Sequence, residues 1–353
     1  RGLMTVIKEH YLHGKHNDES VDEDGIFIGE RHIAVIDGVT SKSVLSLWQP
    51  TPGVVAKNTV MHALATAEER FVGRASIDRE GPAAERRPMA GEDSVAEVRF
   101  MVGENSIVGK NSMSKKASAA EHASASGKAA YESWPMRRLQ RHIDGMLRAQ
   151  YTTNPKADAD FFRIHPIERL QANAVVYSAE FREIWLFGDC QAMVNGRRIE
   201  TVKEVDLLLS AMRSFVWQAR EEGDMANRRF AKSAESDETA ATKSDDPGRD
   251  AIMPFLRMQS AFTNKRGKYG YFVFDGFTDA EYPIRSIRVT PGDEVVLASD
   301  GYPILERTLA RSEAQLARLK ADDPHLIDIY PSTKGFTPGL DSFDDRAYIR
   351  FIA

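Results

Sequence analysis

The sequence predicts an antiparallel α+β sandwich, and three features of the chain support this. Its apolar runs are strand-sized and are separated by connections short enough for hairpins. Segments with helical periodicity stand between groups of strands, whereas a doubly wound fold needs a helix after almost every strand. A parallel dinucleotide-type sheet would also need a glycine-rich first turn, which the sequence lacks.

The N-terminal part predicts a β-hairpin followed by a helix. Two apolar runs, 26–28 and 33–36, are separated by the turn-like residues 29–31. The second run ends in Asp37-Gly38. Apolar residues then return at helical spacing over 56–67, after Pro52-Gly53. Asp37 is therefore expected at a strand end that precedes a helix.

The rest of the chain predicts further strands and helices around two polar segments. Residues 74–133 and 221–250 are rich in small and charged residues, so we expect two insertions, the first partly disordered and the second a flexible loop. Apolar spacing predicts helices at 136–147, 205–216 and 305–319, and strands at 173–178, 183–187, 269–274, 284–289, 294–298 and 347–352.

Composition limits the classes of partner and the compartment. The net charge of −5 is mild, which argues against nucleic acid and against an anionic membrane as partners. A single cysteine, Cys190, rules out a disulfide within the chain and suits a reducing, cytoplasmic setting. No apolar run is long enough to span a membrane or to form the core of a signal peptide. Nothing indicates the oligomeric state.

Acidic residues recur at the ends of the predicted strands. Asp37, Asp275 and Asp300 each follow an apolar run and precede glycine, while Asp189 follows one through Gly188. A carboxylate on a rigid strand end can be aimed at one point, and a set of oxygen ligands without His or Cys suits Mg²⁺ or Mn²⁺. Each Asp-Gly pair alone is more typical of a hairpin turn than of a metal ligand.

Five motifs in order resemble those of the metal-dependent protein phosphatase 2C (PPM) family. They are Asp22-Glu23-Asp24, Val35-Ile36-Asp37-Gly38, Leu186-Phe187-Gly188-Asp189 with Cys190-Gln191-Ala192, Val296-Leu297-Ala298-Ser299-Asp300-Gly301, and Asp344-Asp345-Arg346-Ala347. The resemblance covers nearly the whole chain. It implies a single domain over 1–353, built as two antiparallel sheets flanked by pairs of long helices.

The resemblance also implies a two-metal site and a role for each residue in it. Two Mg²⁺ or Mn²⁺ ions, held about 3.5–4 Å apart, would share a bridging hydroxide that attacks the phosphorus of phosphoserine, phosphothreonine or a small phosphomonoester. No covalent phospho-enzyme is needed, so Cys190 can be an ordinary buried residue. The implied catalytic and metal-binding residues are Asp37 bridging both ions, Asp300 and Asp344 on the first, Glu23 and the Gly38 carbonyl on the second, and Asp24 as an outer ligand through water. Asp189 is expected to fix its turn, and Asp275 to be a turn residue.

Two positions depart from the family pattern. Glu19 stands where the family has a phosphate-binding Arg, and Val39 stands where many members have a His that protonates the leaving group. A carboxylate cannot bind phosphate in that way, so a cation such as Lys15, Arg31 or Lys42 would have to replace the Arg.

Three functions therefore stay open from the sequence. The first is an active phosphatase acting on a phosphoprotein or a small phosphorylated substrate. The second, motivated by Glu19 and by the missing Gly-Gly after Asp37-Gly38, is a weak or inactive pseudophosphatase that serves as a binding or regulatory module. The third is a carbohydrate- or nucleotide-binding β-sandwich in which the Asp-Gly pairs are only turns.

Overall fold

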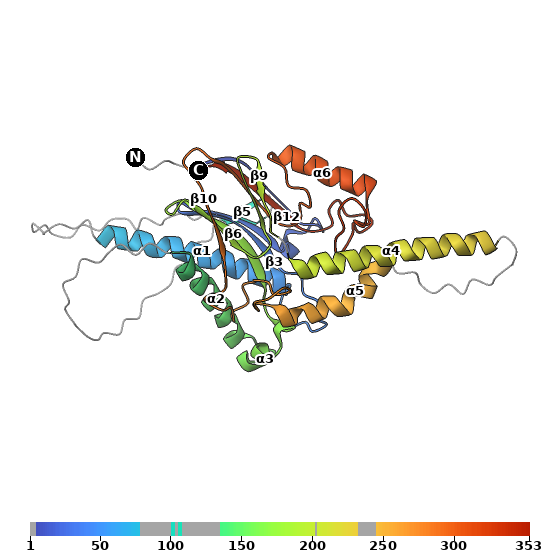
Figure 1. Cartoon of the computed structure of the whole chain (residues 1–353). Coiled ribbons are helices and arrows are strands. Elements are labelled where there is room, and N and C mark those ends of the chain that lie inside the picture. The colour runs from blue at the N-terminus through green and yellow to red at the C-terminus, as the bar shows by residue number, and fades with distance from the viewer. Residues whose placement is uncertain (1–4, 78–99, 103–104, 108–134, 202, 232–244) are drawn as a thin grey trace, which may run out of the picture.

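Two antiparallel β-sheets form the centre of the molecule (Figure 1). The computed structural model describes residues 5–77, 100–102, 105–107, 135–201, 203–231 and 245–353. The five-stranded sheet has the order β1 (Val6–His13), β12 (Arg346–Ile352), β11 (Glu294–Ala298), β8 (Gln191–Val194) and β9 (Arg197–Ile199). The seven-stranded sheet has the order β10 (Arg285–Arg288), β7 (Glu183–Phe187), β6 (Ala172–Ser178), β3 (His32–Gly38), β2 (Asp24–Ile28), β4 (Phe100–Val102) and β5 (Asn105–Ile107).

Strand alternation divides the buried side chains between the two faces of the seven-stranded sheet. On β3, Ile33 and Val35 enter the core between the sheets, while Ala34 and Ile36 enter the core under the helices. Successive side chains of a strand point to opposite faces, so a strand buried on both sides is apolar at every position. The predicted hairpin is confirmed: β2 and β3 pair in a register that places Asp24 opposite Asp37.

Helices cover both sides of the sandwich. The helices α1 (Pro52–Ile77) and α2 (Met136–Thr153) pack on the outer face of the seven-stranded sheet, where Leu64 and Ile143 join its core. Segment 302–309, which leads into α6 (Leu309–Asp322), covers side chains such as Tyr348 on the outer face of the other sheet. The predicted fold class, a two-sheet antiparallel sandwich with helices, is therefore confirmed.

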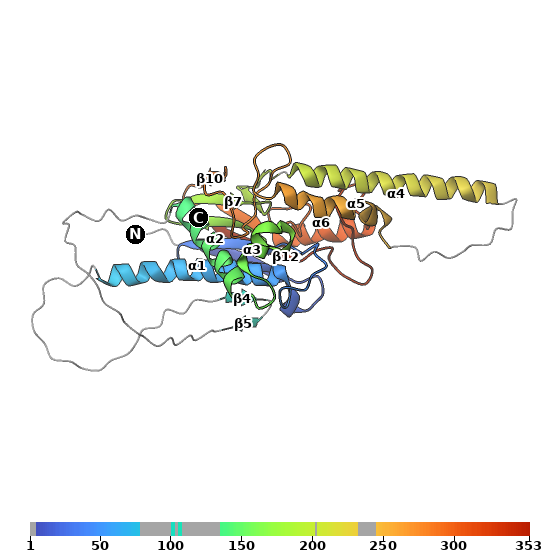
Figure 2. The ribbon, with the colours of Figure 1, turned by 90° about the horizontal axis from the view of Figure 1, so that it is seen from below.

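A second pair of helices extends from one side of the sandwich. Helices α4 (Glu204–Ala231) and α5 (Pro247–Met258) pack against each other through a small core that includes Leu209 and Ile252. Figures 1 and 2 show α4 reaching well beyond the sheets in both views. The remaining short elements are α3 (Ala159–Ile164) and the 3₁₀ turns Glu19–Val21, Pro166–Glu168 and Gln259–Phe262. No described helix has the length and apolar character needed to cross a bilayer.

Several boundaries differ from the sequence prediction. The predicted loop 221–250 is wrong at both ends, because α4 continues to Ala231 and α5 begins at Pro247. The predicted strand 269–274 forms only isolated bridges at Tyr271 and Phe274. Most of the predicted insertion 74–133 lies outside the described residues. Its first residues continue α1, and its residues 100–102 form β4.

Candidate metal centre

Five aspartates line one cavity of about 310 Å³: Asp206 in the first turn of α4, and four that lie at or next to strand ends. Asp37 lies near the end of β3, and Asp189 lies in the turn between β7 and β8. Asp300 follows β11, and Asp344 precedes β12. The hairpins and the sandwich topology bring these strand ends to the same edge of the two sheets. The three aspartates expected to be catalytic thus face a common space, together with Asp189.

The carboxylates in the cavity act on one another electrostatically. Burial, followed by the negative charge of Asp300 and Asp189, raises the pKa of Asp37 well above its usual range. Asp300 is exposed to the cavity, yet desolvation by the cavity walls, followed by the charges of Asp344 and Asp189, raises its pKa to about 7. Carboxylates that repel one another in this way are stabilised by a cation placed between them.

Asp344 already has two cationic partners. The ammonium group of Lys15 lies 2.9 Å from Asp344 Oδ1, and that of Lys334 donates to Oδ2. Burial opposes ionisation of Asp344, but Lys334 and Lys15 outweigh it and hold its pKa well below the usual range. The neighbouring Asp345 accepts the backbone N–H groups of Lys15 (2.9 Å) and Glu23 (2.8 Å), so it fixes the chain around the cavity.

Glu23 points into a neighbouring hollow of about 230 Å³ and does not line the main cavity. Its two carboxylate oxygens accept the hydroxyls of Thr40 and Thr51. Gly38 and Gly53 pack so closely beside it that a Cβ atom on Gly38 would lie 2.1 Å from the Gly53 carbonyl oxygen. The glycine of the Asp-Gly motif is therefore required by this contact between β3 and the start of α1.

Asp24 lies on β2 opposite Asp37 and does not line the cavity. It is 3% exposed, and burial, then Asp37 and Asp22, raise its pKa well above the usual range. Its Oδ2 atom has no hydrogen-bond partner among the described residues, and neither has Oδ2 of Asp22, whose pKa burial and Asp345 raise to about 7. Lys57 of α1 is buried, and the negative charges of Asp22 and Asp24 act on its ammonium group.

The donor set fits a hard divalent cation. Asp37, Asp189 and Asp300 offer only oxygen, and Oδ1 of Asp189 is buried without a hydrogen-bond partner in the described part of the chain. Mg²⁺ and Mn²⁺ prefer such ligands. Within the described residues no three acidic, His or Cys side chains form a ready-made metal cage. Asp344 would join the ligands only after its lysines move away.

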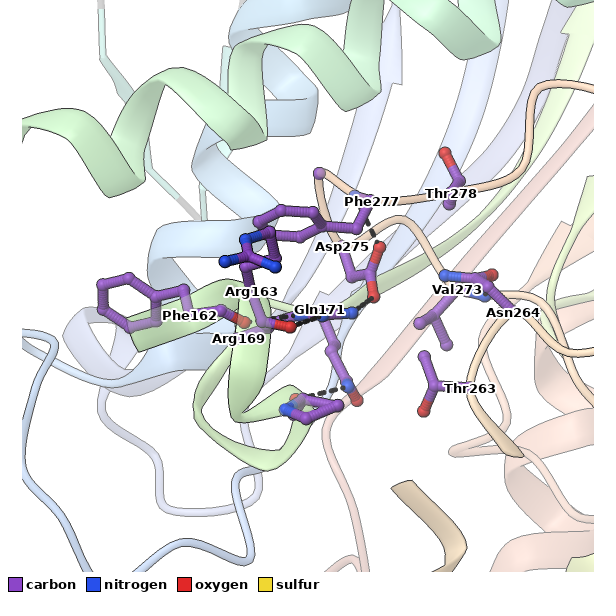
Figure 3. Close-up of polar contacts among 12 residues, drawn as sticks. Phe162, Arg163, Arg169, Gln171, Thr263, Asn264, Val273, Asp275, Phe277 and Thr278 are labelled. Atoms are coloured by element: carbon purple, nitrogen blue, oxygen red, sulfur yellow. Dashed lines mark hydrogen bonds and ion pairs between the residues drawn. The ribbon is translucent and has the colours of Figure 1, made fainter. Parts of the chain in front are cut away.

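Asp275 and Cys190 lie in surroundings typical of structural residues. Asp275, fully buried, binds Arg169 at 2.9 Å and accepts the Phe277 N–H, and Gly276 has a φ of +81° (Figure 3). The turn interpretation of Asp275 is thus confirmed, with a buried ion pair added to it. Cys190 is buried, as expected, and burial raises the pKa of its thiol well above the ordinary value.

The two positions that depart from the family pattern lie apart from each other. Glu19 is exposed on a 3₁₀ turn and does not line the main cavity. Val39 does line it, as an apolar wall.

The sequence interpretation missed most of the cations in this cavity. Five Lys and Arg side chains line it, Lys15, Lys42, Lys203, Arg249 and Lys334, and the sequence pointed only to the first two as phosphate-binding candidates. They come from loops and helix starts whose side chains carry no periodic signal. Arg249 also lies in a segment predicted to be a loop.

Comparison with known proteins gives structural likenesses only. No family model and no curated protein sequence matches the chain. Among solved structures, the catalytic domain of the serine/threonine protein phosphatase PstP with two manganese ions is 13% identical, with 99% of this chain and 98% of that one covered and a TM-score of 0.39. The PPM Ser-Thr phosphatase MsPP of Mycobacterium smegmatis, in complex with cacodylate, is 10% identical, with 98% and 97% covered and a TM-score of 0.38. RsbX in complex with magnesium is 10% identical, with 99% of each chain covered and a TM-score of 0.34. Because these likenesses are weak, they assign no activity to this chain. An assignment of activity has to rest on the residues of the cavity.

Proposed function

We propose that this chain is a divalent-metal-dependent phosphatase that hydrolyses phosphomonoesters, such as phosphoserine or phosphothreonine in proteins or a small phosphorylated compound. The observation that carries the proposal is the meeting of Asp37, Asp189, Asp300 and Asp344 in one cavity that also contains cations. Carboxylates alone would repel a phosphate dianion. Carboxylates that hold metal ions, next to basic side chains, can bind one.

Each group has a proposed task in this reaction. Asp37 and Asp300 would hold Mg²⁺ or Mn²⁺. Asp189, which the sequence assigned only to its turn, would join them because its buried Oδ1 has no partner among the described residues and it lines the cavity. Asp344 would join once Lys15 or Lys334 is displaced. Bound divalent ions supply an activated water at neutral pH and neutralise charge on the phosphoryl oxygens. Gly38 and Gly53 keep β3 and α1 in close contact, which fixes the position of the Asp37 backbone.

Glu23, the Gly38 carbonyl and Asp24 are proposed for supporting roles. Glu23 and Gly38 would reach a second ion only if the Glu23 carboxylate left its hydrogen bonds to Thr40 and Thr51. Asp24, the cross-strand partner of Asp37, has a buried oxygen without a hydrogen-bond partner among the described residues, and it would act through water. A second ion is therefore the less supported part of the proposal.

Manganese-stimulated hydrolysis of p-nitrophenyl phosphate tests the proposal. The wild-type protein should release nitrophenol only when Mn²⁺ is added, and Asp37→Asn should lower kcat/KM by at least about a hundredfold, because even outer-shell changes cost 10–100-fold at metal sites. Asp160→Asn is the matched control, since that side chain is 79% exposed on α3. If the wild-type protein shows no turnover and Asp37→Asn leaves Mn²⁺ binding unchanged, the proposed activity is refuted.

A pseudophosphatase is the second candidate, and the occupied ligands favour it. The ammonium groups on Asp344 and the hydroxyls on Glu23 already satisfy two of the implied metal ligands. A protein of this kind would bind a phosphopeptide without turnover. Binding of a phosphoserine peptide by the wild-type protein, with no release of phosphate over hours in Mn²⁺, would support it over the active enzyme.

A further inference from the structure

The charges of the cavity lining divide into paired and unpaired groups. The lining contains five carboxylates, Asp37, Asp189, Asp206, Asp300 and Asp344, and the five cations named above. Three of those cations have carboxylate partners. Lys15 and Lys334 bind Asp344, and Lys203 lies 3.3 Å from Asp206 and 3.9 Å from Asp189.

Lys42 and Arg249 form no ion pair with any carboxylate in the described part of the chain. Lys42 lies in the loop that follows β3, on the wall shared by the main cavity and a side pocket of about 50 Å³. Arg249, in the first turn of α5, donates through Nη1 to the Thr333 carbonyl at 2.6 Å. The two carboxylates whose charge acts on it, Asp246 and Asp344, are each already ion-paired with other cations.

The charges that surround Lys42 are mostly of the same sign. Burial, followed by the positive charges of Lys203, Lys334 and Arg249, lowers the pKa of Lys42 to about 8. Cations gathered in one cavity repel each other and lose hydration, and a bound anion relieves both costs. The geometry therefore favours an anion between the unpaired members of this group.

A buried ion pair fixes Arg249 in place. Arg213 of α4 is fully buried and binds Asp246, the N-cap residue of α5, at 2.7 Å. Nη1 of Arg213 donates to the Ser332 carbonyl at 3.1 Å, and Arg249 donates to the carbonyl of the next residue, Thr333. The start of α5 and the 332–334 loop are thus held together, and Arg249 is oriented before any ligand arrives.

An unsatisfied acceptor lies in the same wall. Gln259 is 8% exposed and lines both the main cavity and the side pocket. Its Oε1 atom is buried and has no hydrogen-bond partner among the described residues. An O–H or N–H group of a bound ligand would satisfy it, so the wall offers an acceptor as well as positive charge.

We propose that Lys42 and Arg249 form an anion subsite that holds the phosphate group of a phosphomonoester. This rests on the proposed function, since it assigns the substrate's phosphate to a wall of the same cavity. Two unpaired positive charges balance a phosphate dianion, whereas a single carboxylate would leave one of them uncompensated. The subsite consists of the protein's own side chains, so it binds phosphate without a metal ion.

Calorimetric titration with inorganic phosphate at pH 7 in EDTA tests the subsite separately from catalysis. The wild-type protein should bind, and Lys42→Met and Arg249→Met should each weaken the dissociation constant at least about tenfold, as expected for one lost charge-assisted contact. Lys42→Arg keeps the charge and should stay within about threefold of wild type. Arg249→Lys keeps the charge but loses the guanidinium geometry, so its affinity should fall between those of wild type and Arg249→Met. Lys265→Met, at an exposed position, is the matched control and should bind as wild type.

The outcomes separate this inference from the proposed function. Wild-type protein that binds no phosphate in EDTA, or correctly folded Met variants that bind it as wild type does, would overturn the subsite even if aryl phosphate is hydrolysed. Phosphate binding that depends on Lys42 and Arg249 in a protein without hydrolysis would support the subsite and leave the phosphatase activity refuted. A phosphoserine peptide that binds better than inorganic phosphate, with the same dependence on both residues, would identify a phosphoprotein as the source of the phosphate.

Discussion

Lys334 should compete with a metal ion for Asp344, and Lys334→Met tests this competition. The Lys334 ammonium donates to Asp344 Oδ2, while Lys15 occupies Oδ1 at 2.9 Å. A divalent ion that uses this carboxylate has to displace at least one of them. Methionine has a similar length without the charge, so the variant removes one competitor and leaves the packing of the cavity wall nearly unchanged.

The size of the effect follows from the contact that is lost. A hydrogen bond between charged groups contributes about 1.5–3 kcal/mol. The side chains of Lys334 and Asp344 are 25% and 18% exposed, so the lower end of that range applies. Removing about 1.5 kcal/mol of competition should tighten the Mn²⁺ dissociation constant roughly tenfold.

Calorimetry with Mn²⁺ at pH 7 in moderate salt measures this directly. Lys265→Met removes the same charge from an exposed position and corrects for the change in net charge. Lys334→Met should bind Mn²⁺ about ten times more tightly than both the wild type and that control. Equal affinities in all three proteins, with Asp344→Asn also unchanged, would show that Asp344 is not a ligand.

Two further predictions concern stability. Arg169→Met leaves the fully buried Asp275 without its cation, so it should lower the free energy of unfolding, measured in urea, by about 3–5 kcal/mol. The control Arg163→Met, at a side chain 61% exposed, should lower it by less than about 1 kcal/mol. A loss at Arg169 no larger than at Arg163 would contradict a stabilising role for the Arg169–Asp275 pair. Burial raises the pKa of Asp144 to about 6, although it accepts the Gly276 N–H at 2.8 Å. The carboxyl group of Asp144 therefore binds its proton more tightly in the folded state than in the unfolded state. Its contribution to the free energy of unfolding falls as pH rises from about 4 to 6, by up to about 3 kcal/mol. Urea unfolding of wild type and Asp144→Asn across that range should differ in slope, and parallel pH profiles would contradict the assignment.

The sandwich could be predicted because its strands carry a local pattern. The β2–β3 hairpin has apolar residues on both sides of a short turn, and β6, β7 and β12 are continuously or alternately apolar. Such runs identify themselves in the sequence without knowledge of their partners. By contrast β1, an edge strand interrupted by the adjacent Lys8 and Glu9, lacks a continuous apolar run and was not predicted.

Helix α4 shows why polar composition was misleading. Its second half, from Glu221 onward, was interpreted as a loop because it offers few apolar side chains to bury. Glu221, Glu222 and Asp224 are exposed or half-buried, and the helix extends beyond the sheets, where no apolar stripe is required. A solvated helix and a polar loop have similar compositions, so composition alone cannot separate them.

The candidate site could be predicted only as a set of backbone positions. The sequence indicated that Asp37, Asp300 and Asp344 end or precede strands, and the topology brings these ends together. It could not indicate that Glu23 turns toward two threonines, or that Lys334 reaches Asp344 from a loop ten residues earlier. Those contacts depend on side-chain direction and loop conformation, which have no periodic signature.

If the proposed metal and phosphate sites are both present, the lysines of the cavity would link the binding of one to the binding of the other. Without a metal, Lys15 and Lys334 are the counter-ions of Asp344. A divalent ion that replaces them releases two ammonium groups into the same cavity that contains the unpaired Lys42 and Arg249. The released charges favour an anion, and an anion in turn draws the lysines away from Asp344 and favours the metal. By linkage, each ligand must strengthen the other by the same factor. A cavity with equal numbers of acidic and basic side chains is therefore suited to bind a metal ion and a phosphate together.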